Sequence, residues 1–194
     1  MRNWLLAFLI GGLLSSCNHK DTDKTITPAG SDTAERQSFF PVTSFLKGQL
    51  YDFKQRGINP VYYSTVNKHT DSGWLKVEEV DDKVKEFLQP VIDSTNLVSL
   101  FMESKFMDQS IASYTFTYDP KGQLPDSMQL RHWDVYIDAE SGKVRKIYLQ
   151  KRMSPSQELQ LTWQSDKWCT IVTIETTPDG NSTVIKEEKI NWDL

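Results

Sequence analysis

The feature that most constrains the fold of this chain is a change in the spacing of its apolar residues after Gln109. Beyond that residue, apolar and polar side chains alternate, which is the pattern of β-strands with one buried face. Sequences typical of turns separate the alternating segments, and Pro178-Asp179-Gly180-Asn181 is the strongest of these signals. The pattern predicts hairpin-linked strands over residues 111–118, 130–138, 143–151, 157–164, 168–176 and 183–192.

Before Gln109 the apolar residues recur at every third or fourth position, as on one face of a helix. This spacing predicts helices over residues 41–56, 77–88 and 94–102. Between the first two, Asn59-Pro60 breaks the pattern, and residues 61–66 are predicted to form a strand. Helices followed by hairpin-linked strands are typical of the α+β class. We therefore expect two or three N-terminal helices packed on one face of an antiparallel meander sheet of about six strands.

Charge and cysteine content exclude two broad classes of protein. The chain has 194 residues and a formal net charge of −4, so it lacks the basic excess of a nucleic-acid binder and no nucleic-acid partner is expected. Its two cysteines cannot form the framework of a small disulfide-rich protein. Cys169 lies in an apolar, strand-like run, which is typical of a buried and unreactive thiol.

The N-terminus has the parts of a secretory signal. Arg2 supplies a positive charge, residues 4–14 are apolar, and small residues follow them. A helix that spans a bilayer needs about 20 apolar residues, so this run is too short to be a stable span. We therefore expect a signal peptide over residues 1–16.

The end of that run, Leu14-Ser15-Ser16-Cys17, resembles the lipobox of bacterial lipoproteins. The resemblance implies cleavage before Cys17, attachment of acyl chains such as palmitate to Cys17, and stable anchoring in a membrane. Asn18, where Asp would signal retention in the inner membrane, implies the outer membrane, with its periplasmic side and the cell surface both left open. Residues 17–38 are expected to form the lipidated cysteine and a polar, flexible tether, which leaves residues 39–194 as a single domain.

The segment from Trp133 to Tyr148 resembles the hairpin of PepSY-type modules, in which a strand, an acidic turn with glycine and a second strand follow a helix. Modules of that family are secreted or membrane-associated, and they are regarded as inhibitory or binding modules rather than catalysts. The resemblance implies a hairpin topology at this point and a binding role.

Residues that could carry chemistry are sparse. The sequence has no phosphate-binding glycine loop, no paired cysteines for zinc and no serine-hydrolase motif, so we predict no catalytic residue, cofactor or metal. The sharpest group is His132, Asp134 and Asp138, which share one face of a predicted strand. An imidazole beside a carboxylate can bind a metal or act as an oriented base, whereas an ordinary solvated polar face is the simpler interpretation.

Aromatic residues offer a second kind of site. Tyr114, Phe116 and Tyr118 share one face of a predicted strand, and Trp168 begins another strand. Such residues can form a platform for sugars or peptides, although aromatic residues on a sheet more often pack beneath helices. The local basic residues are expected on a solvated strand face, and a site for an anionic partner is the alternative; they are Lys143, Arg145, Lys146, Lys151 and Arg152.

Three functions are compatible with these features. The favoured one is a non-catalytic, lipid-anchored envelope protein that binds a protein partner through an edge or a face of its sheet. The second is an anchored module that binds carbohydrate or peptide on the aromatic residues. The third is a hydrolase or metal-dependent enzyme that uses His132 and Asp134.

Overall fold

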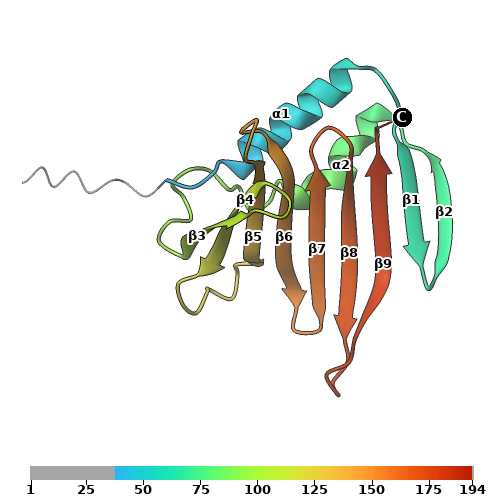
Figure 1. Cartoon of the computed structure of the whole chain (residues 1–194). Helices are drawn as coiled ribbons and strands as arrows, with labels where there is room; N and C mark the ends of the chain where they lie inside the picture. The colour runs from blue at the N-terminus through green and yellow to red at the C-terminus, as the bar shows by residue number, and fades with distance from the viewer. Residues whose placement is uncertain (1–37, 194) are drawn as a thin grey trace, which may run out of the picture. The chain divides into compact units, whose positions relative to one another are not determined.

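The computed structural model describes residues 38–193, so the predicted signal peptide, Cys17 and nearly all of the predicted tether lie outside the described residues. One antiparallel sheet of nine strands dominates the described part, in the order β2-β1-β9-β8-β7-β6-β5-β4-β3 (Figure 1). The α+β class with an antiparallel sheet is thus confirmed. The sheet has more strands than the sequence pattern predicts, because β2 and β3 were not expected as strands.

The chain builds the sheet as a long meander with a hairpin added to one end. Strands β3 to β9 follow one another in space as they do in sequence, and the hairpin of β1 and β2 pairs with β9. The elements are α1 (Val42–Gln55), β1 (Val61–Val66), β2 (His69–Trp74), α2 (Val80–Val84), β3 (Phe101–Asp108), β4 (Ser113–Pro120), β5 (Leu130–Asp138), β6 (Val144–Ser154), β7 (Gln157–Gln164), β8 (Trp168–Thr176) and β9 (Ser182–Asn191).

Both helices lie on one face of the sheet, behind the strands as drawn in Figure 1. Phe53, near the end of α1, contacts Trp192 with ring centroids 5.4 Å apart, and Phe87, just beyond α2, contacts Trp163 at the same distance. Trp163 and Trp192 also contact each other. We call this face of the sheet the helix-covered face, and it carries the core of the domain.

The first predicted helix agrees closely with α1. The residues that it buries recur at helical spacing and include Val42, Leu46, Leu50 and Phe53. Gly57 follows the helix with a left-handed φ of 64°, a conformation that glycine adopts without a steric penalty.

The second predicted helix is only partly formed. A short α2 lies between two 3-10 turns, η1 (Val77–Glu79) and η2 (Lys85–Phe87). Valine and aspartate fill much of this segment, and both have lower helix propensity than alanine or leucine.

The helix predicted over residues 94–102 is wrong. The carboxylate of Asp93 accepts hydrogen bonds from the backbone N–H groups of Thr95 and Asn96, at 2.8 and 2.7 Å, and so closes a turn. Short side chains that bond to nearby backbone compete with helix formation in this way. The chain then enters β3 at Phe101.

Trp133 on β5 lies at the centre of an aromatic cluster in the core. Its side chain is fully buried and stacks on Tyr118, with ring centroids 4.5 Å apart and an interplanar angle of 7°. Phe39 and Phe101 meet Trp133 edge to face at 6.0 and 4.7 Å. The backbone N–H of Phe40 donates a hydrogen bond to the Tyr118 hydroxyl at 3.2 Å, so the segment before α1 is held against β4 and β5.

Lys151 on β6 is buried, which contradicts its expected place on a solvated basic face. Alternation along β6 puts Lys151 on the helix-covered face together with Ile147 and Leu149. Its ammonium group pairs with the carboxylate of Glu86 and donates a second hydrogen bond to the Glu86 backbone carbonyl at 3.3 Å. A buried lysine is stable when such partners satisfy its charge.

The other face of the sheet is not covered by any helix or strand of the described segment, and we call it the open face. The strand register places its side chains in rows that cross the whole sheet. One row passes through all nine strands and contains Ser72, Tyr63, Lys189, Thr170, Thr162, Tyr148, Asp134, Thr117 and Ser104.

Candidate functional site

His132 lies at the centre of a polar cluster on the open face. Its Nδ1 is 2.7 Å from Oδ1 of Asp119 on β4, and its Nε2 is 3.1 Å from Oδ2 of Asp134 on its own strand. Thr117 donates a hydrogen bond to Oδ1 of Asp134 at 2.6 Å, and the Tyr136 hydroxyl donates to Oδ2 at 3.3 Å. The imidazole is thus held between two carboxylates, as the alternation of β5 and its pairing with β4 require.

These contacts favour the charged forms of both partners. The hydrogen bond to Asp134 raises the pKa of His132 to about 9, against the opposing effect of burial and with further help from Asp119. Burial acts to raise the pKa of Asp134, but hydrogen bonds from His132 and Thr117 outweigh it and hold that pKa below its usual range. At neutral pH the cluster is therefore an imidazolium ion paired with carboxylates.

The charge state of His132 limits which chemical roles its ring can take at neutral pH. A protonated ring has no free lone pair, so at neutral pH it can neither accept a proton as a general base nor bind a metal. Among residues 38–193, no group of three or more histidine, cysteine, aspartate or glutamate side chains is placed to hold a metal ion. Cys169 lies on the helix-covered face, where burial raises the pKa of its thiol far above the usual value.

The His132 cluster makes stability depend on pH in a defined direction. Because the pKa of His132 is raised in the folded state from 6.5 to about 9, its stabilising effect is complete below pH 6.5 and disappears as the pH rises towards 9. We expect His132→Gln to lower the free energy of unfolding by about 2 kcal/mol at pH 6, and by much less at pH 9.5. Urea unfolding of both proteins across this pH range measures the difference.

His69→Gln is the matched control for this experiment. His69 also lies near an aspartate, with Nε2 3.3 Å from Oδ1 of Asp71, but its side chain is 80% exposed. Its substitution should change stability equally little at both pH values, since exposed ion pairs contribute little. A His132→Gln effect that stays constant from pH 6 to 9.5 would contradict the proposed charge state.

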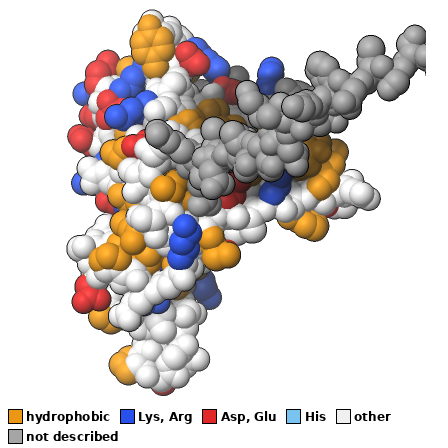
Figure 2. Space-filling model, turned by 90° about the vertical axis from the view of Figure 1, so that its left-hand side faces the viewer, with side chains coloured by type: hydrophobic (Ala, Val, Ile, Leu, Met, Phe, Trp, Pro, Cys, Tyr) orange, Lys and Arg blue, Asp and Glu red, His pale blue; other side chains and the backbone are white. Residues whose placement is uncertain are grey.

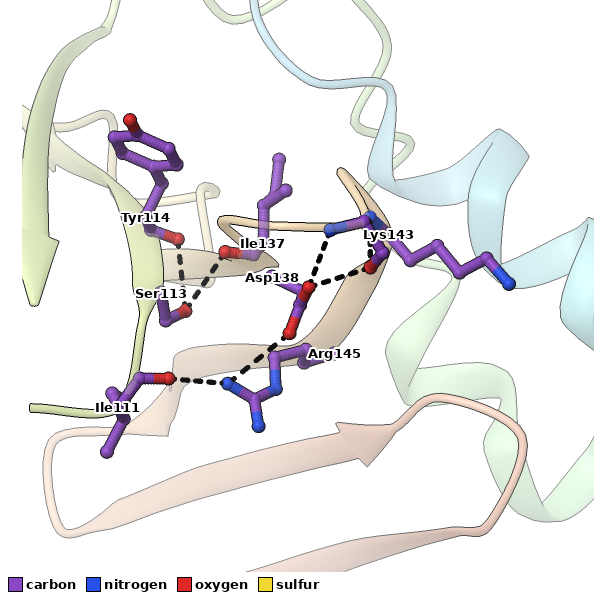
Figure 3. A network of polar contacts seen from close by, with 8 residues as sticks. Ile111, Ser113, Tyr114, Ile137, Asp138, Lys143 and Arg145 are labelled. Atoms are coloured by element: carbon purple, nitrogen blue, oxygen red, sulfur yellow. Dashed lines mark hydrogen bonds and ion pairs between the residues drawn. The ribbon is translucent and has the colours of Figure 1, made fainter. Parts of the chain in front are cut away.

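Asp138, the third residue of the predicted polar group, lies apart from His132 at the end of β5. Its Oδ1 accepts hydrogen bonds from the backbone N–H and the hydroxyl of Ser141, both at 2.8 Å, and so closes the turn to β6. Figure 3 shows Arg145 reaching from β6 towards the Ile111 carbonyl, at 2.8 Å, and towards Asp138, at 3.7 Å. Asp138 therefore has a structural role in the turn.

The four aromatic residues of the predicted platform do not share a face. Tyr114, Phe116 and Tyr118 lie on the helix-covered face, where Tyr118 is fully buried and the Lys105 ammonium group lies 4.6 and 5.0 Å from the rings of Tyr114 and Phe116. Trp168 lies on the open face, with the ammonium group of Lys189 at 5.0 Å from its ring. No single ligand surface can contain all four residues.

The edge strand β2 is the most exposed element of the sheet. It pairs only with β1, and all six of its residues are exposed. Trp74, at its end, has 72% of its surface exposed and lies on the open face beside Val61. Lysine, proline and β-bulges usually protect such edges from pairing with other chains. β2 has no lysine or proline and no register shift against β1, and Asp71 is its one acidic residue.

The opposite edge, β3, differs in this respect. Lys105 and Glu103 on its helix-facing side are charged, which is a common protection of edge strands. Figure 2 looks onto this side of the molecule and shows hydrophobic side chains in separate groups among polar and charged ones. Met102, Phe106 and Ile111 are the large exposed apolar residues here, with 50, 65 and 52% of their surface accessible.

Sequence patterns did not indicate β2, Trp74 or Asp119. Asp71-Ser72-Gly73 has the composition of a turn, and a strand exposed on both faces shows no apolar alternation. Asp119 could be found only from the strand register, because it meets His132 through the pairing of Thr117 with Asp134.

No family model, curated protein or solved structure has a significant match to this chain. The resemblances to bacterial lipoproteins and to PepSY-type hairpins therefore remain predictions. Strands β5 and β6 do form a hairpin at the predicted position. Over the described residues, no helix is both long enough and apolar enough to span a membrane.

Proposed function

We propose that this chain is a lipid-anchored protein of the bacterial envelope, held at the outer membrane by acyl chains on Cys17, and that its domain binds a protein partner without catalysing a reaction. The lipobox-like sequence Leu14-Ser15-Ser16-Cys17 supports the anchor. The fully exposed edge strand β2, which has no lysine, proline or bulge, is the observation that supports the binding role.

The partner supplies an extended segment that pairs with β2 and extends the sheet. Backbone hydrogen bonds provide affinity in this mode of binding, and alternate side chains of the added strand provide specificity. The side chains of the added strand on the open face would meet Trp74 and Ser72 of β2. Val61 and Tyr63 of β1 lie in the same cross-strand rows as Trp74 and Ser72, respectively. We therefore propose a partner segment that places an apolar side chain against Trp74, because burial of an exposed tryptophan stabilises an interface strongly.

The polar cluster does not favour the alternative of an enzyme. Both ring nitrogens of His132 face carboxylates, and the nearby Thr117 hydroxyl donates a hydrogen bond to Asp134. A histidine that activates a hydroxyl nucleophile must accept its proton, and His132 is already protonated at neutral pH.

Site-specific crosslinking in cells tests the proposed edge. Ser72 on β2 and Ser104 on β3 are exposed serines in the same cross-strand row, at opposite edges of the sheet. With a photo-reactive amino acid at position 72, we expect one defined crosslinked envelope protein, and with the same probe at position 104 we expect none. Crosslinking at both positions alike, or only at position 104, would rule out β2 as the binding edge.

Two further variants separate the anchor from the edge. Cys17→Ser should reduce the crosslink at position 72 if the anchor brings the domain to its partner, and it should abolish labelling by palmitate. Trp74→Ala should weaken the same crosslink while leaving palmitate labelling unchanged. A Cys17→Ser protein that still carries palmitate would disprove the anchor and leave the proposal for β2 standing.

A further inference from the structure

A hollow on the open face, distant from β2, contains two arginine side chains that form no ion pair with the described residues. It has a volume of about 380 Å³ and lies between the loop that joins β4 to β5 and strands β5 to β7. Arg131 and Arg152 line both this hollow and an adjoining one of about 380 Å³. Small-molecule sites commonly start at about 300 Å³, so the space suits a small ligand.

A β-bulge positions the first of these arginines. Leu130 pairs with Lys151 and His132 pairs with Gln150, so Arg131 is an extra residue with no partner in the register. Bulges of this kind redirect side chains and are frequent beside functional sites. The backbone N–H of Arg152 donates to the Gln129 carbonyl at 2.8 Å, which makes the two arginines diagonal neighbours across the strand pair.

Neither arginine is ion-paired with a residue between 38 and 193, although the strand register places Glu158 directly opposite Arg152. In the described segment the ion pairs of arginine are those of Arg56 and Arg145. The Nε atom of Arg131 is buried without a hydrogen-bond partner. Because Nε has almost no accessible surface, a ligand in the hollow cannot reach it. An oxyanion there would instead accept from the terminal N–H donors of the guanidinium, which presents five donors in a fixed fork.

The rest of the hollow presents groups suited to hydroxyls. Glu158 lies on its wall, and Oε1 of its carboxylate accepts hydrogen bonds from the amides of Gln150 and Gln160 at 2.8 and 3.3 Å. Asp126 lies on the opposite loop. These carboxylates leave acceptor capacity for hydroxyl donors and would repel a ligand that is anionic at every position.

We propose that this hollow binds a small acidic sugar, with the ligand's carboxylate or phosphate between Arg131 and Arg152 and its hydroxyls towards Glu158. Arginine forms paired hydrogen bonds with both kinds of oxyanion. The proposal is independent of strand pairing at β2.

Calorimetric titration of the full-length protein, in a detergent without a sugar head group, tests this site. The probes are glucuronate, glucose 6-phosphate, neutral glucose, inorganic phosphate and glutamate. We expect at least one of the two acidic sugars to bind and to bind more weakly as salt is added, since screening reduces the attraction between charges. Glucose, inorganic phosphate and glutamate should bind more weakly than that acidic sugar.

Single substitutions assign the binding to the two arginines. Arg131→Gln and Arg152→Gln should each raise the Kd of the acidic sugar about tenfold or more. Arg145→Gln, outside the hollow, should leave the Kd unchanged, and circular dichroism verifies that all three variants are folded. The proposal is overturned if neither acidic sugar binds, if glucose, phosphate or glutamate binds as tightly, or if a folded Arg131→Gln protein keeps the original Kd.

Discussion

Replacement of Trp133 by alanine is expected to lower the free energy of unfolding by about 3–5 kcal/mol, one of the largest losses available to this domain. Trp133 is fully buried, stacks on Tyr118 and meets Phe39 and Phe101 edge to face. Truncation would remove these contacts together and leave a cavity that a sheet cannot close by moving one strand. Urea unfolding followed by circular dichroism measures the loss without depending on tryptophan fluorescence.

Two other substitutions make this experiment specific. Trp74→Ala removes the same side chain from a site with 72% of its surface exposed, and it should change stability by no more than about 0.5 kcal/mol. Trp133→Phe keeps an aromatic ring and removes an indole N–H that is buried without a partner, so it should cost clearly less than the alanine variant. Equal losses for Trp133→Ala and Trp74→Ala would show that the aromatic cluster does not stabilise the core.

Removal of the Glu86 carboxylate is also expected to lower the free energy of unfolding strongly. The Lys151 side chain is only 1% exposed, and Glu86→Ala would leave its ammonium group with the Glu86 backbone carbonyl as its remaining partner. Breaking a buried ion pair in this way is strongly destabilising, and because Glu86 is 28% exposed we expect a loss of about 2–3 kcal/mol.

The double variant Glu86→Gln with Lys151→Met distinguishes charge from packing. Methionine fills nearly the volume of lysine without a charge, so the double variant should be close to the original protein in stability. Thermal unfolding of the single and double variants gives the comparison. If Glu86→Ala has no effect, solvent or another group must already satisfy Lys151.

The sequence predicted the strands from β4 to β9 by their alternation, and β1 by its composition, but it missed β2 and β3. Alternation is visible from Leu130 to Asp138 because every second side chain enters the core. All six residues of β2 are exposed, so nothing in its composition separates that strand from a loop. β3 was predicted partly as helix because the apolar residues before Phe101 also fit helical spacing, and only the turn at Asp93 decides between the two.

The candidate sites could be predicted only where one strand contains them. His132 and Asp134 lie two residues apart, so their shared face follows from the geometry of a strand. Their partner Asp119 comes from β4, and the two arginines of the hollow come from β5 and β6. Contacts between strands depend on register, which turn lengths and bulges set and which a single sequence leaves open.

The order of the strands places the N-terminal segment and the edge strand β2 near opposite ends of the sheet. The described chain begins beside β4, where Phe39 and Phe40 contact Tyr118, whereas β2 lies seven strands away. At about 4.8 Å per strand this is roughly 34 Å. Force on the segment before α1 would therefore enter the molecule at the aromatic core around Trp133, whereas force on β2 would act first on its pairing with β1. If a partner pairs with β2 as proposed above, strain on that partner would thus loosen the edge of the sheet before it reached the aromatic core.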